Sequence, residues 1–353
     1  MKTLDQDQLH FVLESAILAP SADNQHRFRF EITDDGLRIR YTEAELPPEG
    51  GYKRVLALLS LGAVAENLAI AASRFGIGTQ TVLLPDPAQP DLIMQIRLQP
   101  GQAAVDPLWE AIPLRHTNRQ VRFHGPSMTA AERGELEAAA HIYPTSQLHW
   151  LDQPARRRQA LRLMRRAETE RFHNRLLHAE LFSAIRFDVG WRTSCPEGLP
   201  PGALGVEPLL RPFFSQLRHW PVMRLANLVG AHYILGWRAC ALPCRLAPNL
   251  GLLAVKNTDT VTILAAGRAF QRLWLRATQQ GQVLQPMPAS ALYALPGACE
   301  EGITADLRQI LATGWQTILP GEIPLMLFRM GHAQVPAVTP GRRALADYWR
   351  AAS

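Results

Sequence analysis

Residues 61–76 read LGAVAENLAIAASRFG, and residues 266–281 read AGRAFQRLWLRATQQG. At a constant offset of 205 residues the two stretches share four residue types, at Gly62 and Gly267, Leu68 and Leu273, Ala72 and Ala277, and Gly76 and Gly281. In both stretches apolar residues recur at helical spacing, and a glycine stands where a helix would end. A pattern that recurs at a fixed offset predicts that one structural unit occurs twice in the chain.

The first unit is predicted around its long apolar helix, residues 54–75. An amphipathic helix over residues 4–19 precedes it and ends at Pro20, because proline cannot continue a helix. Alternating apolar and polar residues around Gly36 predict a β-hairpin. The expected strands are residues 28–32, 37–41, 79–84 and 92–98. Helices combined with neighbouring strands of this kind indicate the α+β class.

The second unit starts with a copy of the opening helix. Residues 138–144 (AAAHIYP) resemble residues 14–20 (ESAILAP) at an offset of 124, which is 81 residues less than the offset of the long helices. An insertion of about that size is therefore expected at about residues 155–250. We predict two fused halves, 1–110 and 111–353, that form a pseudo-dimer, each a mostly antiparallel sheet flanked by helices. A long inserted segment is either a lid over a functional site or a packing elaboration.

Composition places the chain among compact folded proteins. Of its 353 residues 47% are hydrophobic and 19% are charged, and no uninterrupted apolar stretch approaches the ~18 residues of a membrane span. The polar start lacks the apolar core of a secretion signal, and the four cysteines are read as free thiols. Cys240 and Cys244 lack a second pair with which to form a zinc site. We expect a cytoplasmic protein with no membrane partner and no metal.

The net charge of +6 raises the question of a nucleic-acid partner. Only three of the 37 basic residues are lysines, and the densest run of arginines extends from Arg156 to Arg175. Within that run apolar residues fall at helical spacing, and Glu168 and Glu170 are interspersed. This pattern favours the solvated face of an amphipathic helix over a surface that follows a phosphate backbone, so we expect no nucleic-acid partner.

Most familiar catalytic motifs are missing from the sequence, which has no phosphate-binding loop, no dinucleotide fingerprint, no nucleophile elbow and no His-Glu-x-x-His. The segment from Arg115 to Arg119 stands out instead. If it is extended, the alternating side chains of Arg115, Thr117 and Arg119 project to one side and form an anion clamp. The alternative is the solvated end of a strand.

Four motifs resemble those of the nitroreductase superfamily. The segment Arg115-His116-Thr117-Asn118-Arg119 is similar to its Arg-x-Ser/Thr-x-Arg flavin-binding signature, and residues 19–25 (APSADNQ) resemble its Ala-Pro-Ser-x-x-Asn loop. Gln285-Pro286-Met287 is similar to the segment beside the flavin N5. Residues 329–332 with Arg342 and Arg343 resemble the end of the family's chains. The pattern is closest to the tandem, internally duplicated branch.

This resemblance implies an FMN site between the two halves. Arg115 and Arg119 would hold the ribityl phosphate and the pyrimidine edge, with Thr117 as a hydroxyl partner, and Arg342 or Arg343 would add charge at the phosphate. From the loop after Pro20, Ser21 and Asn24 would bond the polar atoms of the flavin. Gln285, Pro286 and the backbone around Met287 would face N5. The first half has no Arg-x-Ser-x-Arg segment, and the second has a degraded loop at residues 144–146, so one complete site is expected per chain.

Three functions follow from these observations. The first is an FMN-dependent oxidoreductase that uses electrons from NAD(P)H to reduce a small aromatic or quinone-like acceptor. The second is a protein that binds or sequesters FMN under a lid without turnover, and the third is a nucleic-acid or other binding module. Because a flavin supplies its own redox chemistry, we assign no catalytic acid or base. The chain is expected to be a monomer or a homodimer.

Overall fold

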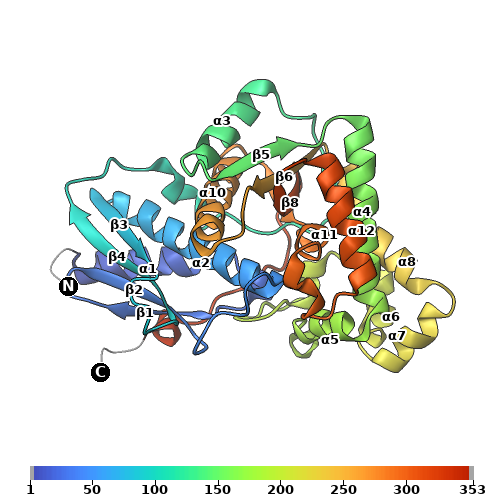
Figure 1. Cartoon of the computed structure of the whole chain (residues 1–353). Coiled ribbons are helices and arrows are strands. Elements are labelled where there is room, and N and C mark those ends of the chain that lie inside the picture. Colours follow the sequence, from blue (N-terminus) through green and yellow to red (C-terminus); the bar gives the residue numbers. More distant parts are fainter. Residues whose placement is uncertain (1–3, 350–353) are drawn as a thin grey trace.

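The computed structural model describes residues 4–349 and contains two four-stranded sheets (Figure 1). In the first sheet the order is β1-β2-β4-β3, and in the second it is β5-β6-β8-β7; every neighbouring pair is antiparallel. The strands are β1 (Phe28–Ile32), β2 (Gly36–Tyr41), β3 (Ile77–Leu83), β4 (Leu92–Pro100), β5 (Ser146–Trp150), β6 (Asn249–Val255), β7 (Val283–Pro286) and β8 (Ile323–Gly331). The α+β class with antiparallel sheets flanked by helices is confirmed, and the two sheets share one strand order.

Two long helices cross between the sheets. They are α2 (Tyr52–Ser73) and α10 (Thr260–Gln279), which contain the repeated stretches of sequence. Figure 1 shows them side by side in the middle of the molecule, with the first sheet to the left. Within residues 4–349, α2 alone is long and apolar enough to cross a membrane, but most of it is buried in the protein core. Its hydrophobicity is therefore explained by packing.

The crossing depends on two glycines. A Cβ atom on Gly62 would overlap the carbonyl oxygen of Leu264, and one on Gly267 would overlap that of Leu59. The contact is thus reciprocal, with each glycine against the backbone of the other helix. Beside it, the Gln271 side chain donates a hydrogen bond of 2.7 Å to the side-chain oxygen of Asn67. Gly62 and Gly267 are therefore needed for close backbone approach rather than for a turn.

Some helices are capped by a residue next to them in the sequence, whereas α2 is capped by a residue from a distant part of the chain. Capping boxes begin α1 (Gln6–Ile17) at Asp5 and α3 (Ala130–His141) at Thr129. The start of α2 has no side-chain cap of its own. Instead, the Glu301 carboxylate from the other end of the chain accepts hydrogen bonds from the backbone N–H groups of Tyr52 and Lys53. A distant residue thereby satisfies the first donors of this helix.

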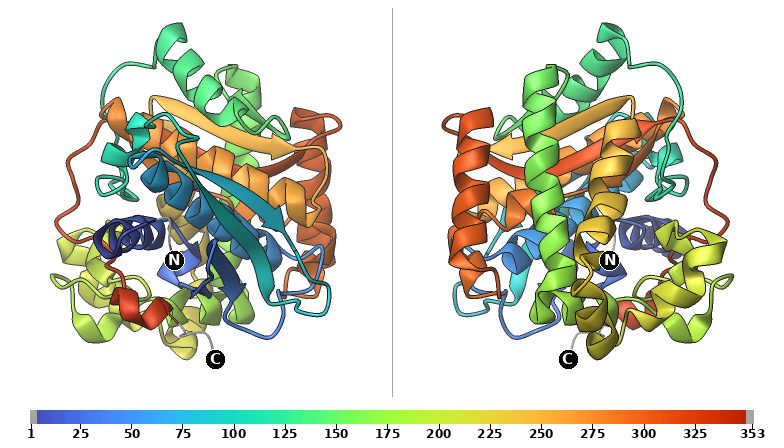
Figure 2. Two further views of the ribbon diagram at one scale, coloured as in Figure 1. Left: turned by 90° about the vertical axis from the view of Figure 1, so that its left-hand side faces the viewer. Right: turned by 90° about the vertical axis from the view of Figure 1, so that its right-hand side faces the viewer.

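The expected insertion lies between β5 and β6. Its helices are α4 (Pro154–His173), α5 (Arg175–Ser183), α6 (Arg211–Gln216), α7 (Trp220–Asn227), α8 (Ala231–Gly236) and α9 (Leu242–Leu246). Figure 2 shows α4 beside α12 (Ala305–Ile318) over the second sheet; α11 (Ala289–Leu292) packs on both of these helices. Most arginines of α4 are exposed, as expected of a solvated face, but Arg171 is an exception because its position turns it into the interior.

We predict that Gly62→Ala destabilises the protein by about 1–3 kcal/mol, because the added methyl group pushes two packed backbones apart. The measurement is the urea midpoint of unfolding. Gly134→Ala is the matched control, since Gly134 is an exposed helical glycine with open space around it, and the change should stabilise by about 0.5–1 kcal/mol. Equal stability of Gly62→Ala and the wild type would contradict the proposed close approach.

Candidate functional site

A cavity of about 550 Å³ lies where the two sheet units and the insertion meet. Leu59 and Ala63 of α2, and Gly267, Phe270 and Trp274 of α10, form one wall, so the crossing helices build it directly. The loop at residues 20–23 and the start of α11 lie along the rim, and α4, α5, α6 and α8 supply the other wall. This volume is in the range of small-molecule and cofactor sites.

The cavity brings together seven of the eleven residues predicted to bind a cofactor. Those that line it are Pro20, Ser21, Thr117, Arg119, Gln285, Pro286 and Met287. They come from three stretches that are far apart in the sequence. Arg115, Asn24, Arg342 and Arg343 are not among the lining residues, so their positions are described separately below.

The segment that carries Thr117 and Arg119 runs as a short extension of the second sheet. Thr117 forms an isolated parallel bridge with Leu284 of β7, and the Asn118 N–H donates to the Leu284 carbonyl oxygen at 3.1 Å. The Asn118 side chain is buried and donates to the Gln334 carbonyl at 2.8 Å. These bonds hold the segment extended, with Thr117 and Arg119 toward the cavity. We expected Arg115 to line the same cavity, but it does not.

Two polar atoms at the cavity are buried without a hydrogen-bond partner. They are the Ser21 hydroxyl oxygen and the Arg119 Nη1. Burial lowers the pKa of Arg119, the nearby Asp23 carboxylate opposes that shift, and the Arg171 charge adds to it. No ion pair within residues 4–349 involves Arg119. A buried guanidinium nitrogen and a hydroxyl left without partners indicate a polar or anionic ligand, because unsatisfied buried groups are costly.

A second pair of cations lies behind the loop. The Arg115 and Arg342 guanidiniums both donate to the Leu18 carbonyl oxygen, at 2.9 and 3.2 Å. Burial, followed by the charge of Arg342, lowers the pKa of Arg115 to about 9, and burial lowers that of Arg342 to about 10. Arg115 also stacks on the Trp274 ring at 4.5 Å, and its Nε is buried without a partner. Two adjacent buried guanidiniums without a carboxylate favour an anion nearby.

The Asn24 side chain forms hydrogen bonds with several residues of the protein. Its side-chain nitrogen donates to the Gly198 carbonyl of the insertion at 3.1 Å, and its side-chain oxygen accepts from Arg342 at 2.7 Å and from His26 at 3.1 Å. Arg343 donates to the His26 carbonyl at 2.9 Å and stacks on Tyr348. Asn24 therefore connects the loop, the insertion and the C-terminal segment. Its predicted contact with a flavin is untested.

Sequence reasoning missed Arg171, which the insertion contributes to the cavity. The Arg171 guanidinium lies 3.4 Å from the Glu168 carboxylate. Burial lowers the pKa of Arg171, but the neighbouring acidic groups, Glu168 first, raise it by more, and the net shift is upward. In the sequence Arg171 is one of many arginines on a helix, and only its spacing with the buried residues Glu168 and Phe172 places it on the inner face.

The insertion is packed tightly against the Arg119 segment. Gly205, with a φ of 69°, lies so close that a Cβ atom would overlap the Arg119 carbonyl oxygen. Residues Leu199, Leu204, Gly205 and Val206 line the cavity along this contact. This segment is therefore part of the cavity wall.

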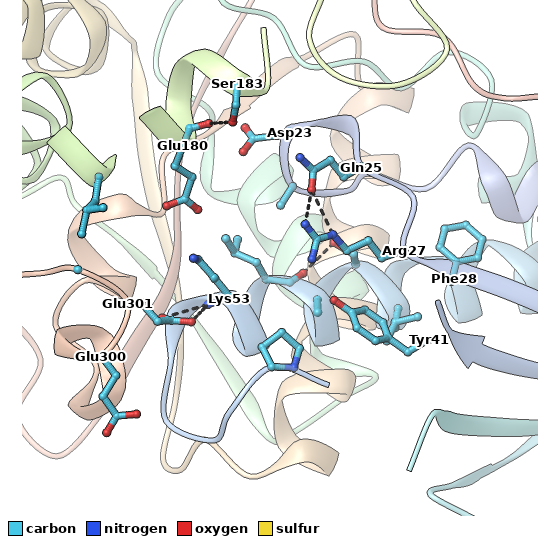
Figure 3. Close-up of a pocket in the computed structure, with 18 residues that line it drawn as sticks. Asp23, Gln25, Arg27, Phe28, Tyr41, Lys53, Glu180, Ser183, Glu300 and Glu301 are labelled. Carbon is cyan, nitrogen blue, oxygen red and sulfur yellow. Dashed lines mark hydrogen bonds between the residues drawn. The ribbon is translucent and has the colours of Figure 1, made fainter. Parts of the chain in front are cut away.

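A second, more polar pocket of about 530 Å³ adjoins the cavity and shares Asp23, Leu56 and Glu180 with it (Figure 3). Four carboxylates line it, those of Asp23, Glu180, Glu300 and Glu301, against the two cations Arg27 and Lys53. Arg27 is paired with Glu43 at 2.8 Å. This charge balance favours an uncharged or cationic molecule over a polyanion at this opening.

Fold and site together define an α+β protein whose two antiparallel sheet units meet at a cavity in which one arginine, Arg119, has no carboxylate partner. No family model matches the chain. It is 24% identical to an uncharacterized protein, MT1398, of Mycobacterium tuberculosis (strain CDC 1551 / Oshkosh), over 96% of this chain and 47% of that protein. The chain thus spans about half the length of the curated relative that it matches.

Among solved structures, the chain is similar to the FMN-dependent nitroreductase NfnB of Mycobacterium smegmatis in complex with NADPH, with 17% identity, 69% of this chain and 97% of that chain covered, and a TM-score of 0.36. It is also similar to a nitroreductase with bound FMN from Bacteroides fragilis, with 9% identity, 68% and 95% covered, and a TM-score of 0.38. These proteins bear the family name that the sequence motifs suggested. At such scores the likeness assigns neither a cofactor nor an activity to this chain.

The buried His26 predicts a pH dependence of stability. Burial, followed by the charges of Arg342 and Arg343, lowers the pKa of His26 to about 3, so the folded imidazole stays neutral. Between that pH and 6.5 only the unfolded chain binds the proton, and stability should fall as the pH falls, by up to about 1.4 kcal/mol per pH unit from this group.

The measurement is urea unfolding of the wild type and of His26→Gln between pH 7 and pH 5. The variant should lose this part of the slope, whereas the exposed His141→Gln should keep it. Parallel slopes for His26→Gln and the wild type would show that His26 is not buried as a neutral ring.

Proposed function

We propose that this chain binds one FMN in the cavity and acts as an FMN-dependent oxidoreductase of the nitroreductase type. Electrons from NAD(P)H would reduce a small aromatic or quinone-like acceptor. The observation that supports this most is the unpartnered pair Ser21 Oγ and Arg119 Nη1, which face one cavity from the two predicted flavin-binding stretches. The remaining donors and their charges are consistent with the same ligand.

The residues present fit this group in chemical terms. Thr117, Arg119 and Ser21 line the cavity and would supply polar groups for a flavin ring and its side chain. Arg115 and Arg342 do not line it, but from behind the loop they add a positive potential that favours a phosphate. Gln285 is held by Arg329, which donates to its side-chain oxygen at 2.8 Å, and the Met287 N–H is engaged by the Leu327 carbonyl at 2.7 Å. When bound, the flavin supplies the electron-transfer chemistry, while the chain binds, orients and encloses it.

The chain would be a fusion of two nitroreductase-like halves, residues 1–110 and 111–353. Two observations support this proposal: the sheets share one strand order, and Gly62 and Gly267 make reciprocal contacts across the helix crossing. Such a pair is what a pseudo-two-fold axis between α2 and α10 would produce.

One flavin per chain is proposed because the place equivalent to the cavity is filled. At an offset of 205, Arg268 corresponds to Ala63, which lines the cavity, and at an offset of 124, Tyr143 corresponds to Ala19. The Tyr143 hydroxyl donates to the Glu66 carboxylate at 2.6 Å, Arg268 pairs with the same carboxylate at 2.7 Å, and the Arg268 guanidinium stacks on the Tyr143 ring. Large, mutually bonded side chains thus take the space that small ones leave open at the first site.

We predict that the purified protein is yellow with a flavin absorption spectrum, and that Arg119→Ala weakens FMN binding at least about tenfold, because a charge-assisted hydrogen bond is lost. The measurement is the amount of flavin per chain after gel filtration, together with titration of the apoprotein with FMN. The exposed Arg158→Ala removes the same charge outside the cavity and should bind normally. Unchanged FMN affinity in Arg119→Ala would place the cofactor elsewhere.

A second candidate function is flavin sequestration without turnover. It is favoured by the tight contact of Gly205 with the Arg119 backbone and by the acidic lining of the adjoining pocket, which disfavours entry of a dinucleotide there. Anaerobic addition of NADH or NADPH distinguishes the two functions. Rapid bleaching of the flavin absorption supports an oxidoreductase, whereas a spectrum that only dithionite bleaches supports sequestration.

A further inference from the structure

Three helices of the insertion present large apolar side chains to solvent. They form one corner of the molecule, where Figure 1 shows α6, α7 and α8 at the lower right. We name this the α6–α8 surface and define it by its exposed members, Leu209, Leu210, Phe213, Val222, Leu225, Leu228, Val229, Tyr233, Ile234 and Trp237. Leu228 is 79% exposed and Val229 is 84% exposed. Half of the large hydrophobic residues that are exposed in the described chain fall within these 29 positions.

Internal packing does not explain this surface. On α7, Met223 points inward and packs with Phe172, Phe182, Ile185 and Leu217 in a small core of the insertion. Val222 and Leu225 lie at helical spacing away from Met223, and Leu228 and Val229 follow in the turn after the helix; all four are exposed. A helix that is apolar on its outer side as well as its inner side requires a partner for the outer side.

The charge of the same region is of one sign. No aspartate or glutamate occurs between Glu207 and Asp259, whereas Arg211, Arg218, Arg224, Arg238 and Arg245 lie in the insertion part of that stretch. Glu207 neutralises Arg238 in an ion pair. The exposed Arg218, Arg224 and Arg245 have no carboxylate partner in the described residues. Apolar side chains on short helices flanked by arginines are the pattern of helices that lie in a lipid interface.

We propose that the α6–α8 surface docks on an anionic lipid bilayer. Exposed leucine, valine and isoleucine would enter the acyl boundary, and Arg218 and Arg224 would contact the headgroups. Symmetric pairing of two copies through this surface is disfavoured, because it would bring arginines against arginines without an acidic residue to offset them. The sequence-based expectation of no membrane partner rested on the lack of a spanning segment, and docking requires none.

The surface is continuous with the cavity, which gives the docking a consequence. Leu210, Phe213 and Ile234 belong to both, since they are exposed and also line the cavity. A molecule that leaves the bilayer at this point meets these apolar side chains first. The ligand admitted here is therefore an apolar, membrane-dissolved molecule. The entry of such a ligand into the cavity rests on the proposed function. The docking of the α6–α8 surface on a bilayer does not.

The test is co-flotation of the full chain with vesicles of phosphatidylcholine alone and of phosphatidylcholine with phosphatidylglycerol. Wild-type protein should float with the anionic vesicles, and moderate salt should weaken binding. The double variant Leu228→Asp with Val229→Asp should lower the partition coefficient about tenfold or more, because apolar contacts are replaced by negative charges that the anionic bilayer repels. Val105→Asp with Val335→Asp makes the same change at exposed residues outside the surface and should bind like the wild type.

Circular dichroism shows whether the variants fold, and Arg224→Glu provides an independent charge reversal that should also reduce flotation. Equal flotation of the Leu228/Val229 variant and the wild type would overturn the proposal. Failure of the wild type to bind anionic vesicles would also overturn it. In that case gel filtration distinguishes the alternatives: a monomer would leave another protein as the partner of the surface, and a dimer that the variant dissociates would show pairing of two copies. Flavin content is read separately: vesicle binding by a colourless protein would count against the proposed function and not against the docking.

Discussion

The backbone contact between α2 and α10 is the constraint on which the rest of the structure depends. Because Gly62 and Gly267 lack side chains, the two helices meet at carbonyl oxygens, and both sheet units are fixed relative to this crossing. The same helices supply Leu59, Ala63, Phe270 and Trp274 to the cavity wall. A wider crossing would separate the loop at residues 20–23 from the segment at Thr117 and Arg119. The glycines of the repeat thus determine the site as well as the fold.

At one place in the structure, arginine side chains lack carboxylate partners. Arg171 has Glu168 beside it, and Arg268 and Arg272 share Glu66. Arg115 is buried and Arg119 and Arg342 are half-buried, and carbonyl groups and an aromatic face lie against Arg115 and Arg342 instead of carboxylates. Removal of a guanidinium from water costs several kcal/mol unless a charge compensates it. The anionic ligand proposed for this site would compensate the three guanidinium groups close to the loop.

The sequence predicted the elements that local rules determine. Helical spacing identified α2 and α10, and alternation identified the hairpin of β1 and β2. The difference between the two offsets predicted an insertion at about residues 155–250, where the long connection between β5 and β6 lies. The motifs identified seven residues that line the cavity. Other features follow from contacts across long sequence distances and have no local signal: the cap of α2 by Glu301, the network of Asn24 with His26 and Arg342, and the inward turn of Arg171. Arg115 was expected beside Arg119, but a bond to Leu18 and stacking on Trp274 place it behind the loop.

The segment between β5 and β6 is much longer than the one between β1 and β2, and this inequality accounts for several features at once. The insertion adds a wall only to the cavity next to Arg119, where Gly205 lies against the backbone. Near Tyr143, on the other hand, the network of Glu66, Arg268 and Arg272 packs together without a cavity wall from this segment. An enclosed site then needs an opening, and the wall ends at Leu210, Phe213 and Ile234, where the side chains are exposed. The absence of acidic residues between Glu207 and Asp259 gives that opening one charge sign, so the same segment that closes the cavity also selects what approaches it.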